Sequence, residues 1–266
     1  MCSYDLIVFA GGVLGTTRLL LKLKTTSLPE LSDKVGYGVR TNSESLVGVT
    51  TRDKDKVFSD GVAISSILHT DENSHVEPVR YSAGSGIWRL LMSPMIKGNN
   101  VFVRIIKIII DLFLHPINNF KAFTVNDWSA QNQILLFIQT IYSTLRLTKG
   151  RFGLKSTVDT GDPPSAFIPE AKAIADAYAK IVNGKPMVLL TETVLGIPTT
   201  AHILGGAVMG KDAEEGVIDK DNKVFGYENM YVCDGSMISA NIGVNPSLTI
   251  TALSERAMSK IKPKGK

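Results

Sequence analysis

The feature that most constrains the fold lies in the last third of the chain, where a strand-like run and two turn-forming pairs precede a helical pattern. Residues 230–233 have the composition of a short strand, which ends at Asp234 and the glycine after it. Asn245 is a preferred N-cap residue, and Pro246 suits the first helical position, where its missing N–H costs nothing. The sequence therefore predicts a helix whose first-turn N–H groups can hold an anion. A helix that is capped only for its own stability fits the same residues.

The helix predicted from Leu248 onward has a single apolar stripe. Leu253, Ala257 and Ile261 recur at intervals of four residues, whereas most of the residues between them are polar. This spacing puts the apolar side chains on one side, as in a surface helix that packs on a sheet.

A second strand, turn and helix are predicted at the start of the chain. Residues 4–9 form an apolar run of strand length, Gly11, Gly12 and Gly15 lie in the turn, and residues 16–24 have a helical pattern. Such a unit can bring backbone N–H groups close to a phosphate. The glycine spacing is not the full G-x-G-x-x-G fingerprint of dinucleotide binding, because the first glycine is missing and no acidic residue follows at the right distance.

The middle of the chain alternates between strand patterns and polar turns. Residues 46–51 and 57–68 are predicted strands joined by the charged turn 52–56, and residues 133–158 predict a β-meander. A helix is predicted from Pro169 to about residue 182. The residues expected on its buried side are Ala171, Ile174, Ala175, Tyr178 and Ile181. A mostly antiparallel middle is therefore flanked by two segments of α/β character.

The most apolar stretch of the chain covers residues 101–114. It is too short to span a membrane, and Arg104, Lys107 and Asp111 interrupt it. The pattern predicts a helix that is either buried in a core or placed at an interface.

The composition is that of a globular protein. The 266 residues are 44% hydrophobic and 20% charged, which suits one large or two modest domains. The net charge of +4 is small and both signs are interleaved, so no nucleic-acid-binding face is indicated.

Cys2 and Cys233 are far apart and lack zinc-ligand spacing, so neither a disulfide framework nor a metal site is predicted. No signal-peptide pattern is visible, and a cytoplasmic location is expected.

Five short motifs follow one another along nearly the whole chain. They are residues 10–15, residues 39–45, residues 75–81, residues 202–206 (His-Ile-Leu-Gly-Gly) and residues 234–246. In this order they resemble the carboxyl-terminal part of the glucose-methanol-choline (GMC) flavin oxidoreductases, and in particular their cholesterol oxidase branch.

The resemblance implies an α+β (α/β) fold with two domains. Residues 1–40 and 215–266 would form a discontinuous part of an FAD-binding, Rossmann-like domain. Residues 41–214 would form a substrate-binding domain, built on a mostly antiparallel sheet covered by helices. The resembled enzymes begin with a complete G-x-G-x-x-G turn that holds the FAD pyrophosphate, and this sequence contains no such turn. The chain is therefore expected to be a fragment that binds FAD poorly by itself.

The resemblance assigns the oxidation chemistry to His202 and Asn245. The family's histidine faces the flavin and orders the substrate hydroxyl while hydride leaves carbon for the flavin. Its asparagine lies at the flavin edge, with the start of the next helix near the pyrimidine end of the ring. The residues implied to contact the cofactor are Gly11, Gly12, Gly15, Asp234, Gly235, Asn245, Pro246 and Ser247. A satisfied loop histidine and a purely structural N-cap asparagine are the alternatives.

Glu77 matches the family's active-site base. In the family that carboxylate, in an apolar pocket, moves a proton between two carbons of the steroid and so shifts a double bond into conjugation with the new ketone. Arg80 follows three residues later and could pair with Glu77, which would weaken the glutamate as an acid. A solvent-facing glutamate at a strand edge is the alternative.

These assignments predict an FAD-dependent oxidoreductase that converts the hydroxyl of a sterol-like secondary alcohol to a ketone, with isomerisation if Glu77 acts. The expected partners are a lipid-like alcohol, the missing amino-terminal FAD-binding segment and, transiently, a membrane surface that residues 101–114 contact as a lid or anchor. The alternative is a truncated or split-gene fragment without flavin binding or activity of its own. An oxidase and a dehydrogenase fit the sequence equally, because access of oxygen depends on tunnels and not on a motif.

Overall fold

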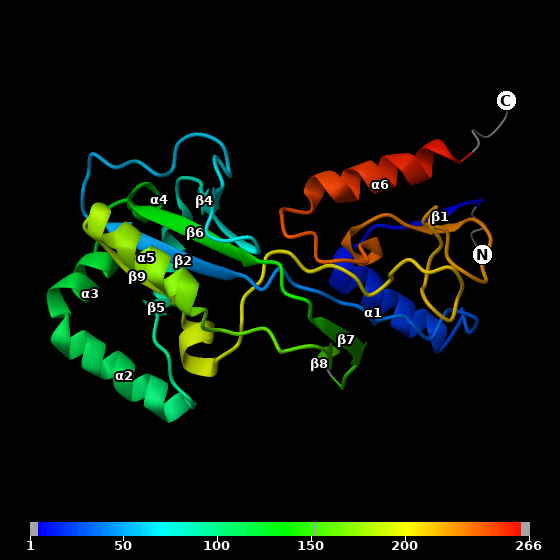
Figure 1. The fold of residues 1–266 in the computed structure, drawn as a ribbon, viewed down its shortest axis with the longest axis horizontal. Helices are drawn as coiled ribbons and strands as arrows, with labels where there is room; N and C mark the ends of the chain where they lie inside the picture. Colours follow the sequence, from blue (N-terminus) through cyan, green and yellow to red (C-terminus); the bar gives the residue numbers. More distant parts are fainter. Residues whose placement is uncertain (1–4, 152, 262–266) are drawn as a thin grey trace. The chain divides into compact units, whose positions relative to one another are not determined.

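A computed structural model describes residues 5–151 and 153–261, and it divides into two compact units (Figure 1). The first unit comprises Met1–Asn42, Thr140–Pro163 and His202–Lys266, and the second comprises Ser43–Gln139 and Pro164–Ala201. Cys2, Tyr4 and the basic tail from residue 262 onward lie outside the described residues.

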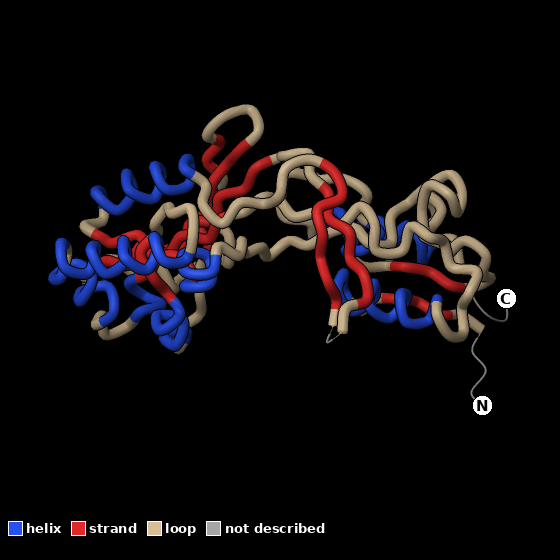
Figure 2. Tube along the Cα trace, turned by 90° about the horizontal axis from the view of Figure 1, so that it is seen from below, coloured by secondary structure: helices blue, strands red, loops and turns tan. Residues whose placement is uncertain are grey.

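The first unit contains a parallel strand pair, an antiparallel hairpin and two long helices (Figure 2). Its elements are β1 (Ile7–Phe9), α1 (Gly12–Lys24), β7 (Thr144–Lys149), β8 (Leu154–Thr160), β10 (Met230–Val232), the short 3-10 helix η3 (Gly235–Met237) and α6 (Ser247–Ser259). Strand β1 pairs in parallel with β10, so the strand at the start of the chain lies beside the strand near its end. The two strand-turn-helix patterns predicted from the sequence are confirmed, and they are neighbours.

The core of the first unit forms around α1 and the segments after β10. Leu20 is fully buried with Leu204, Ile218 and Val232, whereas Leu19 on the other side of α1 is exposed. In α6 the predicted stripe is shallow, since Ala257 is the buried residue of that helix. Packing in this unit therefore depends more on α1 and the central loops than on α6.

The second unit is built on a six-stranded sheet in the order β3-β4-β6-β2-β9-β5, in which all neighbours are antiparallel. Its strands are β2 (Ser45–Thr51), β3 (Leu68–His69), β4 (Ser74–Val79), β5 (Met92–Pro94), β6 (Asn132–Gln139) and β9 (Gly184–Leu189). Its helical elements are η1 (Ser85–Leu91), α2 (Val101–Leu114), α3 (Pro116–Phe123), α4 (Trp128–Gln131), α5 (Pro169–Ile181) and η2 (Thr191–Leu195). The predicted α+β class, with a mostly antiparallel sheet covered by helices, is confirmed.

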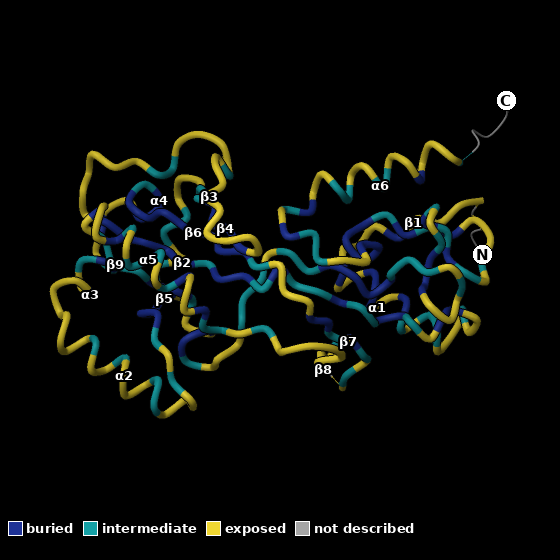
Figure 3. Tube along the Cα trace, in the orientation of Figure 1, coloured by how far each residue is buried: buried dark blue, intermediate teal, exposed yellow. Residues whose placement is uncertain are grey.

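Each face of this sheet carries its own core, because successive side chains of a strand point to opposite faces. Val49 and Phe137 belong to the core under α5, where Ala175 of the helix is fully buried. Ile134 belongs to the opposite core, with Trp128 of α4. Figure 3 shows the central strands β2 and β6 in the colour of buried residues.

Two predicted strand pairings are wrong. Strand β6 pairs with β2 and β4 in the large sheet, and β7 and β8 form a separate hairpin instead of continuing a meander. Residues 57–67 contain no strand that pairs with β2, whose neighbours are β6 and β9. Both β2 and β6 are buried along nearly their whole length, so each takes a central position between two partners that are distant in sequence.

The positions of the helices in the second unit were predicted better than the identity of their buried residues. Helix α5 begins at Pro169 as expected, but its buried stripe runs through Ala171, Ala175 and Ala179. Ile181, expected on the buried side, is 81% exposed because it is the last residue of the helix and lies off that stripe.

Helix α2 has no buried residue, so the interpretation of residues 101–114 as a core helix is wrong. Its charged side chains point to the protein: Arg104 donates to the Val194 and Gly98 carbonyls, and Asp111 pairs with Lys185 at 2.9 Å. The apolar side is left outside, and Figure 3 shows α2 largely in the colour of exposed residues. Its exposed apolar residues are Val101, Phe102, Ile105, Ile106, Ile109, Ile110, Leu112, Phe113 and Leu114.

One of the two predicted domain boundaries lies close to a boundary between the observed units. The first predicted boundary, at residue 41, lies beside Asn42, the last residue of the first segment of the first unit. Residues 140–163 and 202–214 differ, because they pack with the first unit and were predicted in the substrate domain. The assignment of these units to FAD and to substrate stays a prediction.

A tight turn at two consecutive glycines holds the centre of the first unit. Gly205 and Gly206 have φ values of +80° and +98°, in the region that favours glycine. A Cβ at Gly205 would lie 2.1 Å from the Gly38 carbonyl oxygen, so the two backbones touch directly. Leu204 and Arg40 exchange both backbone hydrogen bonds just before the turn, at 2.7 and 2.9 Å.

Replacing Gly205 by Ala should destabilise the chain by more than about 3 kcal/mol, because strain at positive φ adds to a clash with backbone that cannot rotate away. Urea unfolding followed by circular dichroism would measure the difference. Gly15→Ala is the matched control: Gly15 lies inside α1 with open space at its Cβ position, and alanine there should be neutral or stabilise by up to about 1 kcal/mol. Equal stability of the two variants would contradict the steric argument.

Candidate active site

The buried carboxylate of Asp234 joins the end of β10 to the start of α1. Its Oδ2 accepts the Gly12 N–H at 3.0 Å and the Thr16 hydroxyl at 2.5 Å. Its Oδ1 accepts the N–H of Ser236 at 2.8 Å and the hydroxyl of the same residue at 2.5 Å. A negative charge at the amino end of a helix is favourable, and four donors offset the cost of burying it.

The glycine turn before α1 uses its first N–H groups within the protein. Gly11 donates to the Thr16 hydroxyl at 3.1 Å, Gly12 donates to Asp234, and the helix begins at Gly12, four residues earlier than predicted. Gly12 has a φ of +73°, which explains the glycine at that position. The Asp234 carboxylate therefore occupies the anion position at this turn that the sequence pattern suggested for a phosphate. Contact of Gly11, Gly12 and Gly15 with the cofactor stays a prediction.

The start of α6 differs from the prediction. The helix begins at Ser247 with Pro246 in the N-cap position, and no side chain caps its first turn, so the assignment of Asn245 as the N-cap is wrong. The physical reason is that the Pro246 backbone is already helical, with a φ of −84° and a ψ of −9°, and its carbonyl accepts the N–H of Ile250 at 2.9 Å. Asn245 lies two residues before the first helical residue, Ser247, and is half-buried.

The segments that carry His202 and Asn245 converge at Gly235. A Cβ placed at Gly235 would lie 3.3 Å from the carbonyl oxygen of Ile203 and 3.5 Å from Cδ1 of Ile250, in the first turn of α6. The Gly205 N–H also donates to the Gly235 carbonyl at 3.0 Å. The close approach that the sequence assigned to this glycine is therefore an approach between parts of the protein, which brings the two predicted catalytic segments together.

Anchors on both sides fix the backbone around these two residues. His202 is half-buried and lies between Ala201, whose N–H donates to the Glu44 carboxylate at 2.6 Å, and the hydrogen-bonded Leu204. The buried Asn42 donates its side-chain N–H to the Val244 carbonyl, at 3.1 Å, directly before Asn245. Sequence reasoning missed Glu44 and Asn42, although both lie in the 39–45 motif.

In the second unit Glu77 is fully buried on β4, where Leu136 of β6 is its cross-strand partner. Oε1 of Glu77 lies 3.3 Å from Nε2 of His75. Arg80 instead donates to the Ser59 carbonyl at 3.0 Å. The expected Arg80 pairing was wrong, because residues three apart on an extended chain point to opposite faces, whereas residues two apart share a face. That same rule could have identified His75.

Another buried carboxylate, that of Glu192 in η2, was not predicted. Only 3% of its surface is exposed, and this burial raises the pKa of Glu192 to about 7. The hydroxyl and N–H of Thr199 act in the opposite direction, although neither reaches well-aligned hydrogen-bond geometry with the carboxylate. No local pattern in the sequence marks this residue, since its environment comes from the fold.

Neither a metal site nor a spanning helix is found within the described parts of the chain. No group of three or more His, Cys, Asp or Glu in residues 5–151 and 153–261 could hold a metal ion. Within the same ranges, every helix is too short or too polar to cross a membrane. Cys233 is a free thiol, and burial together with the adjacent Asp234 charge raises its pKa.

The chemistry of the α6 start suits the electron-rich end of a flavin ring. Neither a capping side chain nor an acidic residue occupies its first turn, and Leu248 is 81% exposed. The first N–H groups of a helix have no partner inside it, so they can donate to a ligand that carries negative charge. The residues at this end of α6 therefore fit the cofactor that the resemblance implies.

Stability should fall as the pH rises from about 4.5 to about 7, because Glu192 ionises more readily in the unfolded chain than in the folded one, where its pKa is about 7. Glu192→Gln removes this cost. The variant should therefore be more stable than the parent by about 3 kcal/mol at pH 8 and nearly equal at pH 4. Urea unfolding at both pH values measures this, with Glu170→Gln, at the exposed start of α5, as the control. A difference that does not change with pH would contradict the assignment.

Residues 127–254 match the model of the family described as GMC oxidoreductase. The chain is 41% identical over 264 residues to a cholesterol oxidase of Acinetobacter baumannii and 37% identical over 271 residues to a cholesterol oxidase of Mycobacterium tuberculosis. Each comparison covers 97% of this chain but 47% of the relative. The chain therefore spans about half the length of the curated relatives it matches.

The fold is also found among solved structures. The crystal structure of a formate oxidase superposes with a TM-score of 0.53, over 96% of this chain and 54% of that one, at 13% sequence identity. Identity this low shows the shared fold alone, whereas the cholesterol oxidase relatives and the family match relate the sequences themselves. The chain belongs to the GMC oxidoreductase family and carries its carboxyl-terminal part.

Proposed function

We propose that this chain forms part of an FAD-dependent alcohol oxidoreductase that oxidises a sterol-like secondary alcohol to a ketone. The observation that carries the proposal is the convergence, at Gly235, of the segment after His202 and the first turn of α6. It brings a half-buried imidazole-bearing segment and an uncapped helix start into one region of the first unit. The 41% identity to a cholesterol oxidase supports the choice of substrate class.

In this proposal the start of α6 and Asn245 hold the flavin ring. The first-turn N–H groups would donate to its pyrimidine end, and the Asn42 hydrogen bond to Val244 keeps Asn245 in place. FAD, when bound, supplies the acceptor for the hydride that leaves the carbinol carbon. The contacts to its pyrophosphate are assigned to a further amino-terminal segment with a complete glycine motif, since Asp234 already occupies the turn before α1.

His202 accepts and orders the proton of the substrate hydroxyl. An alcohol loses hydride more easily as its O–H bond weakens, so a base within hydrogen-bond distance of that oxygen lowers the barrier. The anchored Leu204 and the two glycines after it limit movement of the backbone next to the histidine. Positioning of this kind supplies much of the rate of a two-substrate reaction.

Glu77 carries out the isomerisation. A buried carboxylate on an apolar sheet face can take a proton from one carbon of the ketone product and return it to another, because neighbouring water does not compete. Nε2 of His75 lies 3.3 Å from the carboxylate without hydrogen-bond geometry, so it is a polar neighbour of Glu77. A fragment without activity of its own remains the alternative for this chain in isolation.

Helix α2 is proposed as the element that contacts the surface from which a lipid-like alcohol is taken. Phe102 and Phe113, near its two ends, are 79% and 80% exposed. Ile117 and Phe120 of α3 extend the exposed apolar surface. An apolar helix face of this size gains free energy when it enters the interface of a bilayer.

The assignment of His202 can be tested by joining this chain to the amino-terminal half of a cholesterol oxidase relative and measuring oxidation of a 3-hydroxysteroid. His202→Asn should lower kcat by about 100-fold or more, because an asparagine amide can accept a hydrogen bond from the hydroxyl but cannot take up its proton. Glu77→Gln should keep ketone formation and lose the conjugated isomer, which ultraviolet absorbance separates. His115→Asn, at an exposed histidine, is the matched control and should keep full activity. Full activity of the His202 variant would contradict the proposed role of His202.

The role of α2 is tested by replacing both Ile106 and Ile109 with Asp. Since neither side chain is buried, the variant should fold normally, while its binding to neutral phosphatidylcholine vesicles falls by about tenfold or more. Co-sedimentation with vesicles measures the loss. Asp at Ile67 and Ile181, two exposed residues outside α2, should leave vesicle binding unchanged. Unchanged vesicle binding by the folded α2 variant would contradict the proposal.

A further inference from the structure

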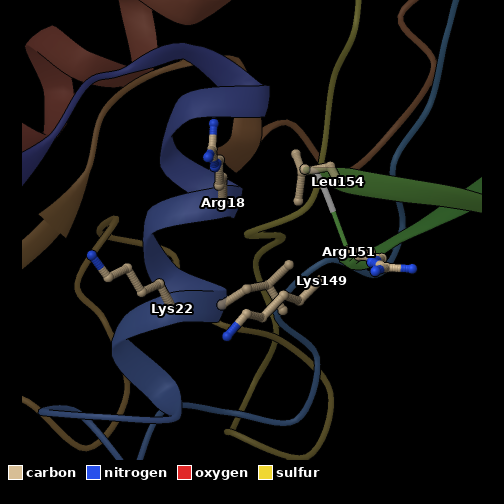
Figure 4. A pocket seen from close by; sticks show the side chains of 8 residues that line it. Arg18, Lys22, Lys149, Arg151 and Leu154 are labelled. Atoms are coloured by element: carbon tan, nitrogen blue, oxygen red, sulfur yellow. The ribbon is translucent and has the colours of Figure 1, made fainter.

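A cavity of about 370 Å³ lies in the first unit between α1 and the turn that joins β7 to β8 (Figure 4). Its first lining residue on α1, Arg18, follows Gly12 by six residues, or about 9 Å of helix. Its lining residues are Arg18, Leu21, Lys22, Lys149, Gly150, Arg151, Gly153 and Leu154.

Four of these lining residues are basic and none is acidic. Arg18 and Lys22 come from successive turns of α1, and Lys149 and Arg151 come from the hairpin turn. Figure 4 shows their charged ends pointing in different directions and not gathered at one point. The site therefore suits a ligand with more than one negative group better than a single small ion.

Some cations elsewhere in the first unit have carboxylate partners. Lys24 pairs with Asp33 at 2.6 Å, and Arg256 pairs with Asp221 at 2.7 Å. Among the described residues, Arg18, Lys22 and Lys149 make no ion pair. Like charges held together without a counterion repel, and a bound anion would remove that repulsion.

The walls of the cavity are fixed to each other by packing and hydrogen bonds. Leu147 of β7 is buried in one cluster with Val13 of α1, and its N–H donates to the Gly36 carbonyl at 2.8 Å. The hairpin turn is closed by the Gly150 N–H, which donates to the Gly153 carbonyl at 2.7 Å. The basic side chains are thus mounted on a preformed frame, so a ligand need not order the backbone to bind.

Phosphate groups match this donor set best. Arginine binds phosphate oxygens through two parallel N–H bonds, lysine adds compact charges, and the apolar Leu21 and Leu154 can face a carbon skeleton. We propose that this basic pocket binds a ligand that carries phosphate groups, either a phosphorylated small molecule or a phospholipid headgroup. The proposal does not depend on the flavin chemistry proposed above.

The test uses the whole 266-residue chain and two probes, inorganic pyrophosphate by calorimetric titration and vesicles of phosphatidylcholine with or without phosphatidylglycerol by co-sedimentation. Arg18→Gln with Lys149→Gln should weaken binding by about tenfold or more, and Lys22→Gln with Arg151→Gln should act in the same direction. All four side chains are exposed, so circular dichroism should show unchanged folding. Higher salt should weaken binding by the parent chain.

The matched control removes the same net charge elsewhere in the unit. Lys34 and Arg146 lie over the Tyr37 ring, at 5.6 and 4.1 Å, outside the lining, and their replacement by Gln should change affinity by less than about twofold. Binding of pyrophosphate would identify a soluble ligand. A gain in vesicle binding when phosphatidylglycerol is added, without binding of pyrophosphate, would identify a headgroup. Absence of both effects, or equal loss in the control and the pocket variants, would overturn the proposal.

Discussion

The first unit depends on one buried carboxylate. Asp234 accepts hydrogen bonds from Gly12 and Thr16, more than 200 positions earlier in the chain, and from Ser236 beside it. Loss of a buried, hydrogen-bonded charge leaves several donors without an acceptor, a cost of several kcal/mol. The parallel pairing of β1 with β10 and the position of Gly235 both lie next to this interaction. Because Gly235 contacts the segments of His202 and Asn245, the carboxylate also determines the geometry of the candidate site.

Local patterns in the sequence predicted the helices well and the strand partners poorly. The periodicity of α1, α5 and α6 is set by residues three or four apart, and all three helices are present near the predicted positions. Strand pairing is decided by residues far apart in the chain. β6 is buried on both faces, and nothing within its own eight residues tells whether its neighbour is β7 or, as observed, β2 and β4.

The same distinction explains which parts of the site the sequence could indicate. Two consecutive glycines at 205 and 206 are typical of a tight turn, and the shared face of His75 and Glu77 follows from their spacing, although Arg80 was considered as the partner instead. The partner of Asp234 could not be read from the sequence, because the N–H groups of a glycine turn at a helix start can donate to a phosphate or to a carboxylate equally well. Glu192 gave no signal at all, since its raised pKa arises from burial alone.

Helix α2 combines an apolar outer side with a charged inner side, and this inversion limits how it can move. A rotation about the helix axis would bury the isoleucines, but it would also separate Arg104 from the Val194 carbonyl and Asp111 from Lys185. The Val194 carbonyl and Lys185 would then lie beneath the isoleucine side chains without these partners, which offsets part of the gain from burying the isoleucines. The helix is therefore held in this orientation. Its apolar side is exposed in the folded unit at all times and does not first become exposed when α2 meets another surface.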